Sequence, residues 1–383
     1  MSIHRQGVTV EDMDLVEAVA RFAAGPLAER AAMLDETEGS CLEHVPALGA
    51  MGLLGLNLPV DLGGPGASPA GLLLALVEVS KHCAATSSMI GAPSLGTDAV
   101  YLGGDEAQRQ RLLPHAATGE HLYGFALTEP GGGSNPADLT TRATRHGDHY
   151  QIDGAKQFIS NAGAADRLVV FAKTDPSAGP RGVSAFVVDA TAAGVAVGPP
   201  EKLMGIRSAP SHPVRFDGVR VPVADRLGDE GAGFRIAMRV LDNSRLDVVA
   251  TSLGIAESAL ALTVRWLNER RVGGELLARK QGIQWMVADM KVRLEAAWAL
   301  AMQAVARRAA GQPFSQESTM AKLYASEMVA FVVDTALQLH GGYGYTRTLP
   351  LERMARDARI LRIYEGASEI QRTIIARGVL GTR

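Results

Sequence analysis

The sequence has little that would connect the chain to an oxidising compartment, a membrane or a nucleic acid. Its two cysteines, Cys41 and Cys83, lie far apart and outside any CxxC pattern, so they indicate a reducing compartment without a disulfide framework. The most apolar run, 72–79, is interrupted by Glu78 and is too short to span a bilayer. An apolar signal region is missing from the N-terminus, and no Lys/Arg run stands out against a net charge of −3. We therefore expect a cytoplasmic protein that binds neither membranes nor nucleic acid.

Several familiar catalytic motifs are also missing. The nine histidines show no HExxH spacing, so no metal site is expected. There is no GxSxG elbow, which leaves serine hydrolase chemistry without support. Neither a GxGxxG fingerprint nor a Walker A sequence is present, so a Rossmann or P-loop nucleotide site is not indicated.

The spacing of apolar residues divides the 383-residue chain into three parts. Its 47% hydrophobic and 21% charged residues are typical of a globular protein, and its length suggests two or three domains. Apolar residues recur at helical spacing through 10–120, short β-like runs follow up to about 225, and helical spacing returns after Gly231. We predict domains over 1–120, 121–228 and 229–383.

Within the middle part, apolar runs at 168–171 and 183–188 predict β-strands. Asp153-Gly154 and Asp217-Gly218 are hairpin signals, and alternating residues on either side of the second pair support a turn there.

The C-terminal part predicts three long helices. The first covers roughly 233–270 and the second 277–310, where Gly311 and Pro313 end it. The third reaches His340, and Ser315 is its candidate N-cap.

Glu365 is the candidate acid–base group. It follows a basic helical stretch and directly precedes Gly366, at what reads as the start of another helix. A carboxylate there has unpaired backbone N–H groups for neighbours and needs no side-chain partner to hold it. Burial could raise its pKa to roughly 6–7, which suits a general base. A helix-capping glutamate that only stabilises the first turn is the alternative.

Two glycine-rich segments are further candidates. In 125–135 an apolar run leads into Gly131-Gly132-Gly133, whose backbone N–H groups could approach a phosphate or a flat ring, although such loops are also ordinary mobile turns. Thr128 and Ser134 add hydroxyls on either side. The second segment, 338–345, ends a long helix in glycines, which is a sufficient structural explanation in itself.

Taken together and in order, these segments resemble the acyl-CoA dehydrogenase family over nearly the whole chain. The most specific stretches are 126–135, 156–161, 205–207, 338–345 and 356–372. The resemblance implies a mostly helical α+β protein: an N-terminal helical domain, a middle β-barrel-like or sandwich domain, and a C-terminal four-helix bundle. It also implies an FAD-dependent α,β-dehydrogenation of an acyl thioester to its trans-2-enoyl product.

The resemblance assigns roles residue by residue. Glu365 matches the base of the short- and medium-chain members, taking the α-proton while the β-hydride passes to flavin N5. The backbone N–H of this residue and a flavin hydroxyl would stabilise the thioester oxygen. Positions that match FAD-binding residues are Phe125, Leu127, Thr128, Gly133, Ser134, Phe158, Ile159, Ser160, Arg270, Gln281, Gln338, Gly341, Gly342, Ser368 and Glu369. Positions that match substrate-binding residues are Ser134, Asp242, Arg245 and Gly366.

Two of these assignments carry more detail. Arg270, with Gln338, Gly341 and Gly342, matches positions that reach the FAD of a neighbouring subunit. In some relatives the base lies in an earlier helix, at the position of Ser244. Serine cannot act as that base, which leaves Glu365 as the only matching carboxylate.

The chain departs from the family pattern at a few positions. Asn135 stands where Asp is usual, Asp138 where a small residue is usual, and Thr348 where an acidic or amide residue is expected. Val272-Gly273 replaces a polar-plus-aromatic pair after Arg270. These changes affect expected carrier contacts, FAD affinity and oligomer details more than the reaction type.

The expected partners follow from the same resemblance. They are an acyl-CoA or acyl-carrier-protein substrate, an electron-transferring flavoprotein as acceptor, and a homo-oligomer, with a tetramer favoured over a dimer. Alternative functions are a biosynthetic acyl-carrier-protein dehydrogenase, an acyl-CoA oxidase or hydroxylase that uses O2, and a non-catalytic scaffold. The acidic balance argues against a DNA-associated member.

Overall fold

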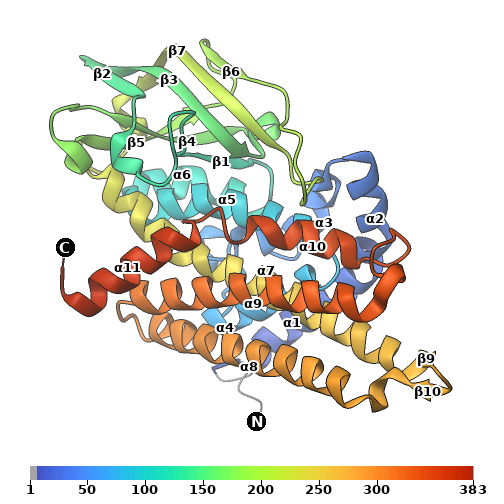
Figure 1. Ribbon diagram of the computed structural model, residues 1–383. Coiled ribbons are helices and arrows are strands. Elements are labelled where there is room, and N and C mark those ends of the chain that lie inside the picture. Colours follow the sequence, from blue (N-terminus) through green and yellow to red (C-terminus); the bar gives the residue numbers. More distant parts are fainter. Residues whose placement is uncertain (1–6, 383) are drawn as a thin grey trace.

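The computed structural model describes residues 7–382 and places a β domain on top of two sets of helices (Figure 1). The helices that precede the β domain are α1 (Val10–Phe22), α2 (Ala28–Thr37), α3 (Val45–Ala50), α4 (Pro69–Ser80), α5 (Ala84–Gly103) and α6 (Glu106–Ala117). A capping box starts α1, because Thr9 Oγ1 accepts from the Asp12 N–H and the Asp12 carboxylate accepts from the Thr9 N–H. Asp12 also accepts from Ser68, the N-cap of α4, and so ties the two helix starts together.

The β domain contains β1 (Tyr123–Ala126), β2 (Arg142–His146), β3 (His149–Ser160), β4 (Arg167–Lys173), β5 (Val183–Asp189), β6 (Val195–Val197), β7 (Ser211–Pro222) and β8 (Arg226–Leu227). The strand order is β6-β7-β3-β2-β4-β5-β8, and β1 pairs with β4 in parallel. A single pair, Arg142 with Lys173, joins β2 to β4. Side chains from β3 and β7 on one side and from β4 and β5 on the other share one apolar cluster, so the sheet folds over as a sandwich.

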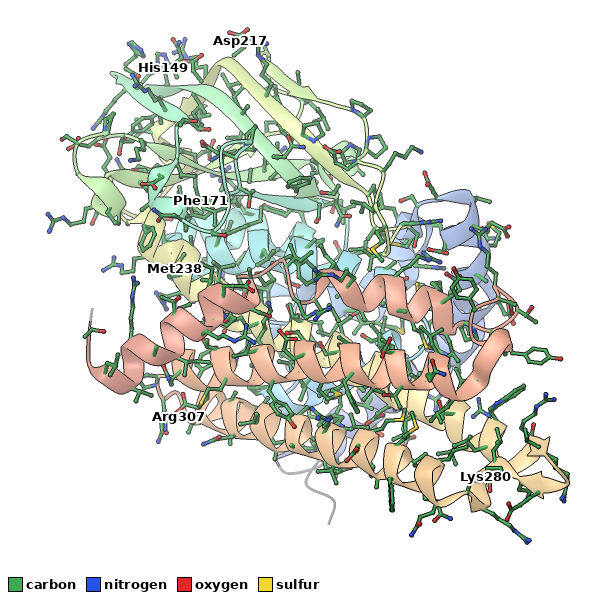
Figure 2. The ribbon with its side chains drawn as sticks, viewed as in Figure 1. His149, Phe171, Asp217, Met238, Lys280 and Arg307 are labelled. Atoms are coloured by element: carbon green, nitrogen blue, oxygen red, sulfur yellow. The ribbon has the colours of Figure 1, made fainter. Side chains whose placement is uncertain are left out.

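Both predicted hairpin turns are wrong. Asp153-Gly154 lies inside β3 and Asp217-Gly218 inside β7, and the two pairs face each other where the register shifts between the strands. Asp153 Oδ1 accepts a 2.7 Å hydrogen bond from the Gly218 N–H across this bulge. The positive φ angles of the two glycines therefore serve a bulge and not a turn. Figure 2 shows Asp217 and His149 at the outer edge of the β domain, far from the helices.

The C-terminal helices are α7 (Gly233–Glu269), α8 (Gln281–Ala309), α9 (Ser315–His340), α10 (Leu351–Ile360) and α11 (Ser368–Leu380), with the short hairpin β9 (Arg271–Val272) and β10 (Glu275–Leu276) between α7 and α8. The first and third helices begin and end close to the predicted bounds. The second begins four residues later than predicted, after a 3-10 turn over Leu277–Arg279. The predicted cap at Ser315 is wrong: the N-cap is Phe314, and Ser315 Oγ instead donates to Asp242.

The core is continuous between the two sets of helices. One apolar cluster contains residues of α4 and α5 together with residues of α7, α8 and α9. Helix α7 is long and apolar enough to cross a membrane by length and composition, but most of its apolar window is buried inside the protein, as expected of a core helix. A second cluster joins the β domain to the helices; in Figure 2, Phe171 of β4 and Met238 of α7 lie at this junction.

A tight contact also joins the loop after β6 to α10. The Ile206 N–H donates to Asp357, and Arg356 of α10 forms a bidentate pair with Asp35 of α2. A Cβ on Gly205 would lie 2.3 Å from the backbone carbonyl of Arg356, so only glycine allows the loop to approach this closely.

Candidate active site

Glu365 lies between α10 and α11, three residues before α11 begins at Ser368. Its backbone is left-handed, with φ of 53°, which is uncommon for a residue other than glycine. Its carboxylate accepts a 2.6 Å hydrogen bond from Ser244 Oγ of α7. Glu365 therefore lies just before a helix start and outside its first turn, and a side chain holds it, although we expected that it would need no such partner.

Ser244 takes on a role that the sequence did not indicate. Its residue type excludes it as the base, because a hydroxyl cannot do that job. In the structure its hydroxyl holds the only carboxylate that matches the base. The bond spans 121 positions of the chain, so no local pattern could have revealed it.

Burial and the neighbouring polar groups act on the pKa of Glu365 in opposite directions. Burial raises the pKa of its carboxyl, while the Ser244 hydrogen bond and the positive charges of Lys322 and Arg245 act to lower it, and burial prevails. Lys322, fully buried in α9, donates a 2.6 Å hydrogen bond to the Gly366 carbonyl. Burial lowers the pKa of Lys322 to about 8, although the Glu365 carboxylate favours its charged form. A raised carboxyl pKa beside a cation is what a general base requires.

Asp242 and Arg245 lie one turn apart on α7, close to Ser244. Arg245 Nη1 donates to Asp242 Oδ1 at 2.5 Å and to Thr319 Oγ1 at 3.2 Å. Ser315 donates to the same Asp242 oxygen. Two of the four predicted substrate residues thus meet near Glu365. Asp242 is bonded to Arg245 and Ser315, whereas Arg245 Nε is buried and has no partner among the described residues.

The glycine loop is held at its base by a buried ion pair. Lys156 Nζ of β3 lies 2.9 Å from Glu129 Oε1 and donates to the Leu127 carbonyl at 3.1 Å. Glu129 also accepts from the backbone N–H groups of Thr140 and Thr141. Burial acts to raise the pKa of Glu129, but Lys156 and these hydrogen bonds outweigh it and lower the pKa to about 2. The two partners lie 27 residues apart, so no local spacing in the sequence indicates their pairing.

Beyond this ion pair, the Gly132 N–H donates to the Glu129 carbonyl at 3.0 Å, and the rest of the tip is open to solvent. Residues 131–134 are exposed, and a Cβ at Gly131 or Gly132 would meet nothing within 4 Å. Ser134 is exposed here, and the departure at Asn135 is accommodated by a 2.6 Å hydrogen bond from its Nδ2 to Asp138.

The neighbouring candidates come from β1 and the end of β3. Phe125 packs on Phe171 with ring centroids 4.9 Å apart, Leu127 is buried, and the Thr128 carbonyl accepts from the Gln157 N–H. In β3, Ile159 is buried and Ser160 is half-buried. Phe158 has a φ of 58° and is 59% exposed, beside a register shift between β3 and β7. An exposed ring held on a left-handed backbone is a strained arrangement that suits a flat ligand.

Helix α7 connects the loop to Glu365. Phe125 and Leu127 share an apolar cluster with Leu241, one turn before the Ser244 that holds Glu365. The apolar cluster that includes the start of the loop and the hydrogen bond to the candidate base therefore both involve the segment 241–245.

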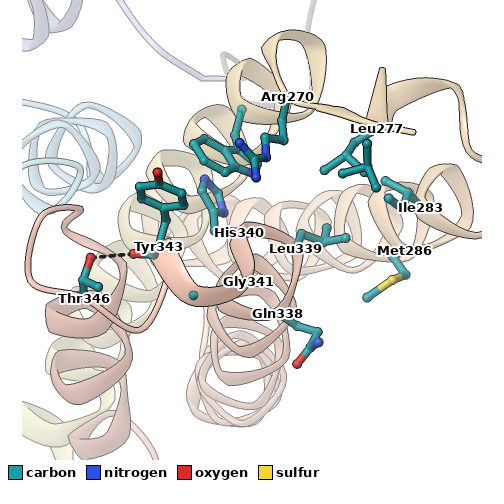
Figure 3. A pocket seen from close by; sticks show the side chains of 13 residues that line it. Arg270, Leu277, Ile283, Met286, Gln338, Leu339, His340, Gly341, Tyr343 and Thr346 are labelled. Atoms are coloured by element: carbon teal, nitrogen blue, oxygen red, sulfur yellow. Dashed lines mark hydrogen bonds between the residues drawn. The ribbon is translucent and has the colours of Figure 1, made fainter. Parts of the chain in front are cut away.

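A separate cavity of about 660 Å³ lies at the far end of the helices (Figure 3). It brings together Arg270, Gln338, Gly341 and Gly342, four of the predicted cofactor residues. The Arg270 guanidinium lies 5.7 Å from the Trp266 ring centroid and 5.9 Å from that of Tyr343. Stacking of this kind orients a planar cation while leaving its N–H donors available to an anion.

Three other predicted cofactor residues are placed differently. Gln281 is exposed at the start of α8 and is not part of the cavity wall. Ser368 Oγ donates to Glu327 of α9 at 2.7 Å, and Glu369 is exposed on the first turn of α11. Within residues 7–382, no group of three His, Cys, Asp or Glu side chains could hold a metal ion.

Comparison with known proteins covers the same three parts of the chain. Residues 9–120 match the acyl-CoA dehydrogenase N-terminal domain, 124–219 the middle domain and 231–380 the C-terminal domain. The breaks between these ranges fall at 121–123, between α6 and β1, and at 220–230, a stretch that contains β8 and ends before α7.

Similar proteins align with almost all of the chain. The acryloyl-CoA reductase (NADH) of Anaerotignum propionicum is 40% identical over 96% of this chain and 94% of its own. The short-chain specific acyl-CoA dehydrogenase of Clostridium acetobutylicum is 39% identical over 95% and 97%. The solved butyryl-CoA dehydrogenase of Megasphaera elsdenii has a TM-score of 0.95 at 35% identity, over 98% of this chain and 99% of that one.

Proposed function

The chain belongs to the acyl-CoA dehydrogenase family of oxidoreductases, and on that premise we propose that it oxidises the Cα–Cβ bond of an acyl thioester with Glu365 as base and FAD as acceptor. The observation that carries the proposal is the half-buried Glu365 carboxylate, whose pKa is raised and which is held by Ser244 near two cations. A capping glutamate on a solvated helix start would have none of these features.

The residues around the glycine loop fit a flavin. The exposed backbone of 131–134 can approach a phosphate or ring edge, and the Phe158 ring offers an exposed aromatic face. Arg270 supplies a fork of donors suited to a pyrophosphate, in a cavity at the C-terminal end of α7, whereas the Ser244 that holds Glu365 lies 26 residues earlier on that helix. That separation supports a homo-oligomer in which Arg270, Gln338, Gly341 and Gly342 serve the FAD of a neighbouring copy. When bound, FAD supplies the acceptor for the β-hydride.

The chain's own residues would handle the proton. Glu365 takes the α-proton, and its ionised form is stabilised by the Ser244 hydroxyl and by Lys322. Within residues 7–382, nothing accepts a hydrogen bond from the Glu365 N–H, so that donor is available to the thioester oxygen as negative charge develops there. The Ser244 contact also keeps the carboxylate from turning away.

The direction of the reaction is a second question, because one relative with 40% identity is a reductase. Proton transfer at Glu365 is reversible, so the same residues serve desaturation and reduction. We propose desaturation, with an electron-transferring flavoprotein as acceptor and a cytoplasmic location consistent with two free, buried cysteines.

Anaerobic mixing of purified protein with acyl thioesters tests the function. We expect a yellow protein whose flavin absorbance bleaches with butyryl-CoA or a longer acyl-CoA. A flavin that stays oxidised with every acyl-CoA and acyl-carrier thioester would refute the proposal. Rapid reoxidation by air with release of peroxide would favour the oxidase alternative.

A further inference from the structure

Two facing helices keep a narrow stripe of partly exposed residues in the middle of the protein. On α5, Ser88, Gly91 and Leu95 are partly exposed while the residues between them are buried. Their spacing places them on one face of the helix. On α7, Asp247 is partly exposed, and every residue from Val248 to Ala256 is buried. Partial exposure this deep requires open space beside these side chains, and Asp247 marks the end of that space along α7.

Asp247 is a carboxylate without a donor. Within residues 7–382 its side chain forms no hydrogen bond and no ion pair. It points toward α5, because a Cβ on Gly91 would lie 3.6 Å from Asp247 Oδ2. Burial raises the pKa of Asp247 well above its usual range, and the charge of Asp98 raises it further. A carboxyl group in these surroundings gains strongly from any donor or cation that enters the space.

Asp98 of α5 adds a second incompletely bonded carboxylate. It is 2% exposed, and its Oδ2 accepts from Asn243 at 2.8 Å and from Asn57 at 3.3 Å. Its Oδ1 is buried and has no partner among the described residues. Asn243 lies one helical turn before Asp247, so both acids face the same region of α7.

The charges in this region do not balance. The nearby cation that favours the ionised form of both acids is Arg308, and its Nη2 donates to Asn57 Oδ1 at 2.8 Å. One guanidinium therefore faces two carboxyl groups, and Glu365 adds a third negative charge that raises the pKa of Asp247. An apolar acyl chain would leave Asp247 and the Oδ1 atom of Asp98 without a donor, whereas a positive group would pair with them.

The position relative to the proposed base fixes where such a group would sit. Asp247 is three residues beyond Ser244, which holds the Glu365 carboxylate. Three residues of α-helix rise about 4.5 Å, or roughly three carbon–carbon bonds. The α-carbon must lie beside the Glu365 carboxylate that takes its proton, and Ser244 holds that carboxylate. A positive group beside Asp247 would thus lie about three bonds beyond the α-carbon, past the β-carbon that gives up the hydride.

We propose that Asp247, supported by Asp98, binds a protonated amine on the acyl chain, so that the preferred substrate is an aminoacyl thioester with its nitrogen about three bonds beyond the α-carbon. This inference rests on the proposed function, since it assumes that the acyl chain lies between α5 and α7. It deepens that function by naming the chemical class of the acyl group.

Three thioesters differing in charge test the inference. 4-(Dimethylammonio)butyryl-CoA carries one N–H donor and a positive charge, 5-methylhexanoyl-CoA is its neutral isostere, and glutaryl-CoA carries a negative charge at a similar place. The measured quantity is the rate constant of anaerobic flavin reduction divided by the half-saturating thioester concentration. We expect the cation to exceed its isostere by about 10- to 100-fold, the range for a hydrogen bond between charged groups, and glutaryl-CoA to be the poorest.

Asp247→Asn should reduce the cation-to-isostere ratio at least tenfold, because asparagine keeps the shape and loses the charge. Asp14→Asn, on the exposed face of α1, is the control and should keep the wild-type ratio. Bound flavin and its reduction by the isostere report whether each variant is folded. Equal values for the neutral isostere and the cation in the wild type would overturn this inference and leave the proposed function standing. A cation-to-isostere ratio that is unchanged in Asp247→Asn would do the same. Failure of all three thioesters and of butyryl-CoA to bleach the flavin would overturn the proposed function, and this inference with it.

Discussion

Replacing Ser244 by alanine removes the hydroxyl that, within residues 7–382, alone donates to the proposed base. The 2.6 Å bond from Ser244 Oγ stabilises the ionised form of Glu365 and so lowers its pKa. A hydrogen bond to a charged group contributes about 1.5–3 kcal/mol. At about 1.4 kcal/mol per pKa unit, its loss should raise the pKa of Glu365 by roughly 1–2 units.

The direction of this pKa shift determines how the rate of flavin reduction should change with pH. Glu365 must be ionised to take the α-proton, so flavin reduction rises with pH through the pKa of this group. In Ser244→Ala the rise should move to higher pH by the same 1–2 units. The rate well below the midpoint should fall roughly 10- to 100-fold, and it should recover at high pH. Stopped-flow measurement of anaerobic flavin bleaching between pH 5 and pH 10 would follow this shift.

Matched variants separate positioning from general damage. Ser244→Thr keeps a hydroxyl and should restore most of the profile. Ser252→Ala, on the same helix, removes a buried hydroxyl that bonds only the Val248 carbonyl at 2.8 Å, and it should leave the midpoint in place. A Ser244→Ala profile with an unmoved midpoint would refute the reasoning, whatever its effect on the plateau.

Two further predictions concern the framework around the site. Lys156→Met leaves Glu129 buried without its cation and should cost about 3–5 kcal/mol in the free energy of unfolding, measured with urea, whereas the half-buried Lys173→Met should cost much less. The pKa of Glu129 is lowered to about 2 in the folded protein, against about 4.5 in the unfolded chain. The contribution of Glu129 to the free energy of unfolding is therefore present above pH 4.5 and disappears as the pH falls toward 2. The Lys156→Met variant should lose this acid sensitivity. Gly205→Ala places a Cβ 2.3 Å from the Arg356 carbonyl and should lower stability by about 1–3 kcal/mol in thermal unfolding, while Gly282→Ala, where a Cβ meets nothing, should not. An unchanged melting temperature for Gly205→Ala would show that the loop does not need its close approach to α10.

Much of the fold follows from periodicity in the sequence. The apolar spacing after Gly231 predicts α7 and α9 almost to the residue, and the runs at 168–171 and 183–188 become β4 and β5. The two Asp-Gly pairs fail as turns because their local preference for positive φ is met equally well in a bulge. Pairing between β3 and β7, which lie about 60 residues apart, decides between the two outcomes.

The candidate site is only partly visible in the sequence for a similar reason. Glu365 and the glycine loop stand out as short motifs, and the resemblance to a family orders them. The contacts that hold them join residues distant in the chain: Ser244 with Glu365, Lys156 with Glu129, and Lys322 with the Gly366 carbonyl. No local spacing encodes such pairs, because helix packing creates them. Ser244 shows this most clearly, since its residue type excluded it as a base while its place on α7 makes it the partner of one.

The most direct test of the central claim, that Glu365 is the base, is anaerobic flavin reduction in Glu365→Gln. Glutamine keeps the size of the side chain and can still meet the Ser244 hydroxyl, but it cannot take a proton. We predict that the variant purifies yellow, binds the acyl thioester and does not bleach with it. Bleaching at the wild-type rate would contradict the account.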